Sequence, residues 1–361
     1  MKKNIFWIMV AIAITAILPS CSSSEEPDIP DNSRLIFEFA TVNRATDGVT
    51  VRSAPYSSEA THKVARASVY AFKDDGGGNY LWVKTYDNIT WPGVGESFGT
   101  YVVPDDQKLA PGDYKLLAVG REATDSYTLT TPTTTTNFND FSASMPYPKV
   151  NRAIFAGSAD ISVSPTGGGR VSIQLTRKVA GIIGYFSNVP TQVGGTAVGS
   201  VHVVITSPGV FGNTSVNLTT GLGSVNYNQV ISIIDVLNIN QQEVDASIGD
   251  GVYKGNDLSS QGVSKVANTQ LNGSFVIPTM NVSMSVVLSP VGAPGTALKS
   301  WKVLKDGSPT FNLDANSFYS IGVKKSNTST DGDNPIDLNK EETFSLTILP
   351  NWQVVNDLTI E

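Results

Sequence analysis

Hydrophobic and polar residues alternate in short runs along most of this chain, which is the pattern of β-strands. The first run covers residues 34–44. Its Leu35, Phe37 and Phe39 are two positions apart and share one face of a strand, whereas Glu38 points to the other face. We therefore predict a strand that buries these three apolar side chains.

Further strand-like runs are separated by Gly, Asn, Asp and Pro, and no long helical period occurs after the N-terminal segment. We predict a hairpin that joins residues 64–72 to 80–84 through 73–79, and a second hairpin from 273–278 and 282–288. The other predicted strands are 98–103, 114–120, 155–164, 170–186, 201–205, 301–304, 318–323 and 343–349. The pattern predicts an all-β fold of the sandwich type.

The length of 361 residues suits two domains of ordinary size. The glycine-rich stretch 165–169 is the best candidate for the boundary between them. We therefore expect one β-sandwich over residues 34–168 and another over residues 169–361.

The N-terminus has the pattern of a secretory signal, with Lys2 and Lys3 before an apolar run that is short for a membrane span. The chain's one cysteine, Cys21, follows this run where a bacterial lipoprotein signal requires it. We predict a signal peptide over 1–20, lipidation of Cys21 and a flexible acidic tether over 21–33. The alternative is an ordinary signal peptide with an incidental cysteine.

The C-terminus keeps an alternating apolar pattern almost to its last residue, although chain ends are usually polar. Such a tail either pairs within its own domain or is donated as a strand to a neighbour. The residues of the candidate donor strand are Trp352, Val354, Leu358 and Ile360.

Composition argues against several functions. A net charge of −7 disfavours nucleic acid as a partner. The two histidines, His62 and His202, do not have metal-ligand spacing, and no glycine-rich phosphate loop opens a helix. Asp331 and Asp333 could hold calcium, but the other ligands of an EF-hand are missing. We predict a protein that is not an enzyme and needs no cofactor.

The order of several segments, which together span most of the chain, resembles the order of such segments in the fimbrillins of Bacteroidales type V pili. These segments are Cys21 with its tether, the strand that ends at Arg44-Ala45, and residues 63–72, 114–119, 175–180, 316–323, 334–336 and 349–354. The resemblance implies two transthyretin-like Greek-key β-sandwich domains in tandem. It also implies export as a lipoprotein to the outer membrane and assembly into a surface fimbrium that supports cell adhesion.

In that family an arginine-specific protease cuts after a basic residue, the first strand is released, and a strand of the next subunit fills the groove. The matching bond here is Arg44-Ala45, with Arg52-Ser53 as the alternative. The removable strand would carry Leu35, Phe37 and Phe39. Partners would then be other copies or related pilin subunits, joined head to tail.

A second hypothesis is a surface lipoprotein that keeps its lipid, either as a fimbrial anchor or as a glycan-binding protein. An anchor would also keep its first strand. A glycan-binding protein would use exposed aromatic residues, for which the candidates are Tyr80, Trp82 and Trp91.

Overall fold

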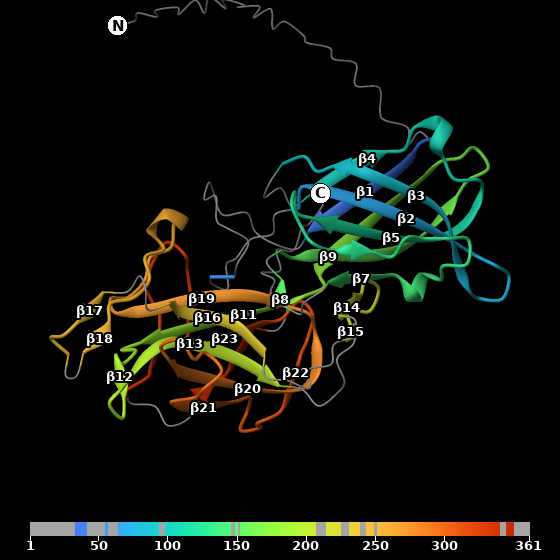
Figure 1. The fold of residues 1–361 in the computed structure, drawn as a ribbon. Helices are drawn as coiled ribbons and strands as arrows, with labels where there is room; N and C mark the ends of the chain where they lie inside the picture. The colour runs from blue at the N-terminus through green and yellow to red at the C-terminus, as the bar shows by residue number, and fades with distance from the viewer. Residues whose placement is uncertain are drawn as a thin grey trace, which may run out of the picture.

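The computed structural model describes residues 33–41, 55–56, 64–93, 98–145, 149–150, 152–206, 214–224, 231–238, 243–248, 251–339 and 344–349. These residues form two lobes of β-strands (Figure 1), and their helical segments are short 3-10 turns such as Asp105–Gln107. The prediction of an all-β fold is confirmed.

The first lobe contains a seven-stranded sheet in the order β3-β2-β5-β9-β10-β1-β4. The strands are β1 (Leu35–Thr41), β2 (Arg66–Asp74), β3 (Tyr80–Thr90), β4 (Phe98–Val102), β5 (Gly112–Arg121), β9 (Ile154–Val163) and β10 (Gly169–Arg177). The predicted hairpin between β2 and β3 is present. Asp74 and Asp75 accept hydrogen bonds from backbone N–H groups of its glycine-rich turn.

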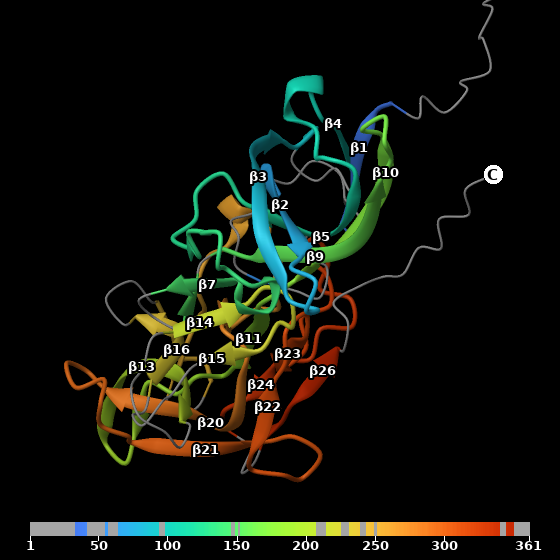
Figure 2. The same cartoon turned by 90° about the vertical axis from the view of Figure 1, so that its right-hand side faces the viewer.

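Strand β10 connects two layers of this lobe. Its residues 169–175 pair in parallel with β1, and only Thr176 and Arg177 pair with β9. At the crossing, a Cβ on Gly157 would lie 1.9 Å from the carbonyl oxygen of Gln174, so only glycine allows this close approach. The strip β10-β1-β4 therefore faces the strands β3-β2-β5-β9 (Figure 2).

The second lobe is built from two larger sheets. One has the order β26-β23-β11-β19-β8, and β24 also pairs with β11. Its strands are β8 (Lys149–Val150), β11 (Ala180–Ser187), β19 (Thr269–Val276), β23 (Phe318–Ile321), β24 (Ile336–Asp337) and β26 (Thr347–Leu349).

The other sheet has the order β12-β13-β20-β21-β25, with β16 on β13 and β22 on β20. Its strands are β12 (Gln192–Val193), β13 (Thr196–Thr206), β16 (Ile231–Asn238), β20 (Thr279–Pro290), β21 (Lys299–Leu304), β22 (Phe311–Leu313) and β25 (Phe344–Ser345). A short ribbon joins β17 (Val244–Asp245) to β18 (Val252–Tyr253).

The predicted hairpin of residues 273–278 and 282–288 is wrong. These residues lie in β19 and β20, which are consecutive strands of different sheets: β19 pairs with β11, and β20 pairs with β13 and β21. Both strands are rich in buried side chains, and the two sheets that they enter enclose the second core.

Two features connect the lobes. A four-stranded sheet pairs β6 (Thr128–Leu129) and β7 (Ser142–Met145) with β14 (Thr214–Asn217) and β15 (Gly223–Ser224), and β8 pairs with β19. One large core cluster accordingly continues from the first lobe to Phe275 and Phe318, while a second core, around Trp301, belongs to the second lobe.

The glycine-rich residues 165–169, where we expected the boundary, form the turn between β9 and β10. Gly167 donates its backbone N–H to Ser164 and Ser164 donates to Gly168 across this turn. The first sheet therefore continues beyond residue 168 to Arg177.

Candidate functional site: the groove filled by the first strand

Strand β1 lies inside the first sheet, between β10 and β4. It pairs in parallel with β10 over residues 35–41 and antiparallel with β4 over residues 36–40. Among the described strands, β4 pairs only with β1. The N-terminal strand is thus a central element that connects an edge strand to the rest of the lobe.

The predicted face of this strand is confirmed as buried. Leu35 and Phe37 have no exposed surface and Phe39 has 1%. The ring of Phe37 lies 5.3 Å from that of Tyr86 on β3, and the ring of Phe39 lies 6.2 Å from that of Trp91. The strand therefore fills the core between the two layers of the lobe.

The opposite face of β1 carries Ile36, Glu38 and Ala40, which are half-buried, and Glu38 is its one charged residue. Arg170 on β10 donates to one carboxylate oxygen of Glu38, from Nη2 at 2.6 Å and from Nε at 3.1 Å. The N-terminal end of the strand is held on both sides by backbone hydrogen bonds, from Val103 to the carbonyl of Leu35 and from Gly169 to that of Arg34.

The geometry indicates what loss of β1 would do. Burial of each large apolar side chain contributes about 1.5–3 kcal/mol, so the three together contribute roughly 5–9 kcal/mol. The whole stability of a domain is only about 5–15 kcal/mol. Without β1, the facing edges of β10 and β4 would be about 9–10 Å apart, which is the space of one strand. Unpaired edges beside an apolar groove are a template for another strand.

Most of the other predicted site residues lie outside the described residues. These are Cys21, Arg44, Ala45, Arg52, Ser53, Trp352, Val354, Leu358 and Ile360. The described part of β1 ends at Thr41, three positions before Arg44. The described part of the C-terminal region ends with β26, which pairs antiparallel with β23 of its own lobe.

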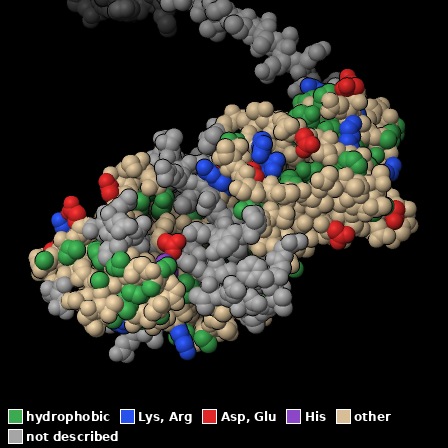
Figure 3. All heavy atoms as spheres, in the orientation of Figure 1, with side chains coloured by type: hydrophobic (Ala, Val, Ile, Leu, Met, Phe, Trp, Pro, Cys, Tyr) green, Lys and Arg blue, Asp and Glu red, His purple; other side chains and the backbone are tan. Residues whose placement is uncertain are grey.

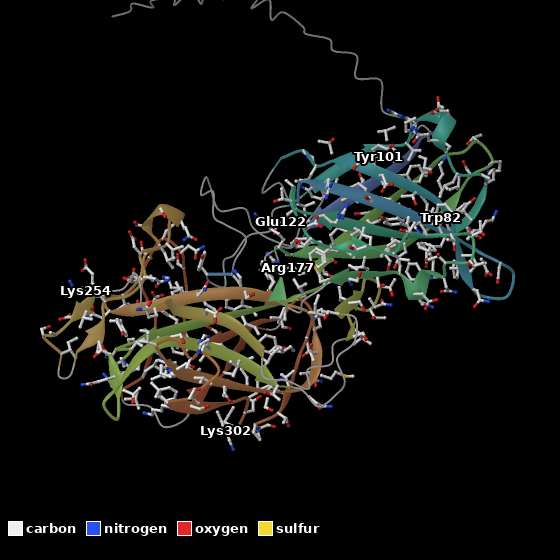
Figure 4. All side chains as sticks on the ribbon, viewed as in Figure 1. Trp82, Tyr101, Glu122, Arg177, Lys254 and Lys302 are labelled. Atoms are coloured by element: carbon white, nitrogen blue, oxygen red, sulfur yellow. The ribbon has the colours of Figure 1, made fainter. Side chains whose placement is uncertain are left out.

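The glycan-binding hypothesis requires Tyr80, Trp82 and Trp91 to be exposed, and for Trp91 this prediction is wrong. Trp91 is only 4% exposed and contacts Phe39 in the core. Trp82 is half-buried and donates from Nε1 to the hydroxyl of Thr85 at 2.8 Å, and Tyr80 lies beneath the ammonium of Lys115 at 4.7 Å. Trp82 lies at the end of the first lobe remote from the second (Figure 4).

The loop of Asp331 and Asp333 holds a lysine side chain. The ammonium of Lys324 contacts both carboxylate oxygens of Asp333, at 2.9 and 3.2 Å, and donates to the carbonyl oxygens of Ser329 and Ser326. Both side chains of this ion pair are fully buried. The position in which a cation would contact Asp333 is therefore filled by the protein's own ammonium group.

Sequence reasoning missed a hydrogen-bonded row of Ser200, His202 and Asp235. The hydroxyl of Ser200 is 2.6 Å from His202 Nε2, and His202 Nδ1 is 2.5 Å from a carboxylate oxygen of Asp235. His202 and Asp235 are directly opposite in β13 and β16, a pairing that sequence alone did not reveal. β13 pairs with β16 on one side and with β20 on the other, so His202 lies within a sheet, beside a shift of register between Val201 and His202.

Sequence reasoning also missed a buried ionic cluster where the lobes meet. Glu122 binds Arg152 at 3.1 Å and accepts the backbone N–H of Ala153. Burial lowers the pKa of Arg177 to about 9, and the negative charge of Glu122 opposes this shift. Figure 4 shows Glu122 and Arg177 in this junction.

The described residues contain no group of three or more His, Cys, Asp or Glu side chains placed to hold a metal ion. None of their helical segments has the length and apolar character that crossing a membrane requires. On the face seen in Figure 3, acidic and basic side chains are interspersed.

The fold and the groove define a two-lobed, all-β protein whose first lobe is completed by an N-terminal strand. The family model of the fimbrillin-A associated anchor proteins Mfa1 and Mfa2 matches residues 43–357. The chain belongs to this family, so the resemblance to fimbrillins is confirmed. No curated protein has a matching sequence.

Several solved structures are similar to this chain at low sequence identity. The fimbrial anchor protein Mfa2 from Porphyromonas gingivalis is 11% identical, with 89% of this chain and 99% of that chain covered and a TM-score of 0.38. A candidate cell adhesion protein from Parabacteroides distasonis is 11% identical, with 90% and 99% covered and a TM-score of 0.46. A candidate adhesin from Bacteroides thetaiotaomicron is 10% identical, with 89% and 96% covered and a TM-score of 0.45.

Proposed function

We propose that this protein is a structural subunit of a surface fimbrium that supports adhesion, and that it is assembled by strand exchange. It is exported as a lipoprotein on Cys21, held at the outer membrane, and cut after Arg44 by an arginine-specific protease, with Arg52 as the alternative site. The observation that supports this proposal is the place of β1 between β10 and β4.

Cleavage at either candidate site would separate β1 from the body of the protein, by which we mean the chain from β2 onward. Arg44 and Arg52 both lie between β1 and β2, so a cut after either residue leaves β1 without a covalent link to the body. The strand is then held by its ladders, by its buried side chains and by the ion pair of Glu38 with Arg170. Cleavage also separates the body from the lipid.

A strand from another subunit then fills the groove. Its source is the C-terminal tail of a copy or of a related subunit, which in this chain carries Trp352, Val354, Leu358 and Ile360. A contact between the groove of one subunit and the tail of the next is head to tail. Such a contact does not close on itself and builds a filament.

The two lobes are two transthyretin-like Greek-key sandwiches in tandem, as the family resemblance implies. The separate large sheets of the two lobes support this division. Because β10 completes the first sheet, the first sandwich lies between Leu35 and Arg177, and apart from β8 the strands of the second sandwich begin with β11.

A second candidate function is that of a fimbrial anchor, which the description of the family favours. An anchor keeps its lipid and keeps β1 in the groove as a permanent strand. The same intramolecular contacts that would be exchanged in a filament subunit then stabilise the first lobe.

The mature N-terminus of the protein on its native cells distinguishes the two functions. A start at Ala45, in ladders that resist SDS, is expected for a strand-exchanging subunit. A start at Ser53 moves the cleavage site and keeps the mechanism. A lipidated Cys21 without ladders contradicts the proposal and supports the anchor. The variants R44A and R52A, compared with each other, assign the bond that is cut.

A further inference from the structure

The groove that β1 fills has two neighbouring aromatic pockets. Phe37 contacts Tyr86 edge to face and contacts Tyr101 on β4 at 6.3 Å between ring centroids. Two positions further along β1, Phe39 contacts Trp91. Both pockets are therefore lined by aromatic rings and are filled by phenylalanine, which leaves Phe37 and Phe39 almost without exposed surface.

Gly99 shapes the second pocket. It lies directly opposite Phe39 in the ladder between β1 and β4. A Cβ on Gly99 would lie 3.2 Å from Pro92 and 3.6 Å from the ring of Trp91, so its absence leaves room for that ring beside the strand. The pocket thus belongs to the walls of the groove and would remain if another strand occupied it.

The rim of the groove carries a positive charge. Arg170 lies on β10 opposite Ile36, and its guanidinium reaches diagonally to Glu38, the residue between the two phenylalanines. The carboxylate side chain is only 18% exposed, although that of Arg170 is 67% exposed. Because Arg170 belongs to the body, it would face the middle residue of any strand in the groove.

The chain's own C-terminal tail lacks the order aromatic, acidic, aromatic that Phe37, Glu38 and Phe39 have. Its first candidate triplet is Trp352-Gln353-Val354, and its second is Leu358-Thr359-Ile360. Neither triplet has an acidic residue in the middle, and neither has two aromatic residues. A smaller side chain in a pocket shaped for phenylalanine leaves a cavity, which is destabilising.

We propose that the groove selects a strand with the order aromatic, acidic, aromatic, carried by a different subunit, and that it discriminates against the protein's own C-terminal tail. This inference rests on the proposed strand exchange. Tyr86, Tyr101 and Trp91 select the two aromatic residues, and Arg170 selects the acid. The protein then joins a partner of this pattern and does not polymerise with itself.

Grafting into the uncut chain tests this preference without any cleavage. In one variant, Phe37, Glu38 and Phe39 are replaced by the residue types of the first tail triplet (F37W/E38Q/F39V). In a second variant they are replaced by those of the second triplet (F37L/E38T/F39I). The control I36V/A40S changes the same strand outside the triplet. Each graft is expected to lower the melting temperature by about 5 °C or more. Grafts that melt within about 2 °C of the control would overturn the inference.

The contribution of Arg170 is tested by charge exchange. R170E and E38R are each expected to lower the melting temperature, and the double variant R170E/E38R is expected to recover most of the loss, because the pair is restored with reversed charge. If the losses of the two single variants simply add in the double variant, Arg170 does not select the acid.

Peptide exchange tests the same preference in the cut protein. After cleavage between β1 and β2, a peptide of residues 34–44 and a peptide of residues 350–361 compete for the groove. The first is expected to bind at least about 10-fold more tightly. Equal binding would overturn the inference. If neither peptide enters, strand exchange is wrong, and the grafted variants still decide what the groove prefers.

Discussion

Phe37 and Tyr86 meet edge to face across the core of the first lobe, with ring centroids 5.3 Å apart and planes inclined by 72°. One ring comes from the N-terminal strand and the other from β3 in the opposite layer. Edge-to-face pairs of this kind contribute about 0.5–1.5 kcal/mol beyond their burial. This contact therefore contributes to the free energy that holds β1 in the first lobe.

Truncation of Phe37 is expected to destabilise the uncut protein strongly. F37A removes a fully buried ring and leaves a cavity beside Tyr86, for an expected loss of about 3–5 kcal/mol in the free energy of unfolding. Denaturant unfolding of the first lobe measures this loss. The control I36A changes the outward face of the same strand and should cost much less. Equal losses would mean that β1 is not held by its inward face.

Removal of the charge on Glu122 is expected to destabilise the junction between the lobes. Glu122 is 4% exposed and lies among Arg152 and the buried Arg177, so E122Q leaves buried positive charge without its partner. Because the Arg152 side chain is 35% exposed, the expected loss is about 1–3 kcal/mol, below that of a fully buried pair. The control D160N breaks the exposed pair with Lys115, which is worth about 0–1 kcal/mol. Comparison of the two unfolding curves checks the prediction, and similar curves would contradict it.

Asp333 is expected to serve stability rather than calcium binding. D333N leaves the fully buried ammonium of Lys324 without its counter-charge, so the melting temperature should fall markedly. The control D331N changes an exposed residue of the same loop and should have little effect. Addition of millimolar calcium to the unchanged protein should leave its melting temperature the same. A rise on addition of calcium, lost in D333N, would refute this assignment.

The stability of the second lobe is expected to rise between about pH 8 and pH 9.5. Burial lowers the pKa of Lys265 to about 8, below its usual value near 10.4, so in this range the unfolded chain binds a proton that the folded chain has lost. Stability then increases with pH. Above about pH 10 buried tyrosines of the second lobe act in the opposite direction, because burial raises the pKa of Tyr319 on β23 to about 12.

Melting curves across this range check the assignment to Lys265. K265M should flatten the rise in melting temperature, because the group that loses its proton is gone. K254M is the matched control, since the hydrogen bond and charge of Glu243 raise the pKa of Lys254 and its contribution is lost, not gained, as pH increases. A rise that persists unchanged in K265M would assign the effect to another group.

Much of this fold can be predicted from local pattern. The alternation of Leu35, Phe37 and Phe39 predicts a strand with one buried face, and the run of Asp and Gly after β2 predicts its hairpin. Both features depend on neighbours a few positions away, so periodicity and turn chemistry are enough to find them. The family of the chain could also be recognised from the order of such segments.

The partners of each strand could not be predicted in this way. Glu38 and Arg170 are 132 positions apart in the chain, yet they lie on adjacent parallel strands. Similarly, the sequences of β19 and β20 resemble a hairpin, yet these strands enter different sheets. The glycine-rich residues 165–169 form the turn between β9 and β10 of one sheet.

The periodic placement of apolar residues therefore decides that this chain forms strands and which face of β1 is buried. Only the assembled structure decides that β1 lies between β10 and β4, that Tyr86, Tyr101 and Trp91 line its groove, and that Arg170 stands at the rim. The reason is physical: a strand's alternation is compatible with many neighbours, and the competition among all strands for burial and backbone pairing selects one of them.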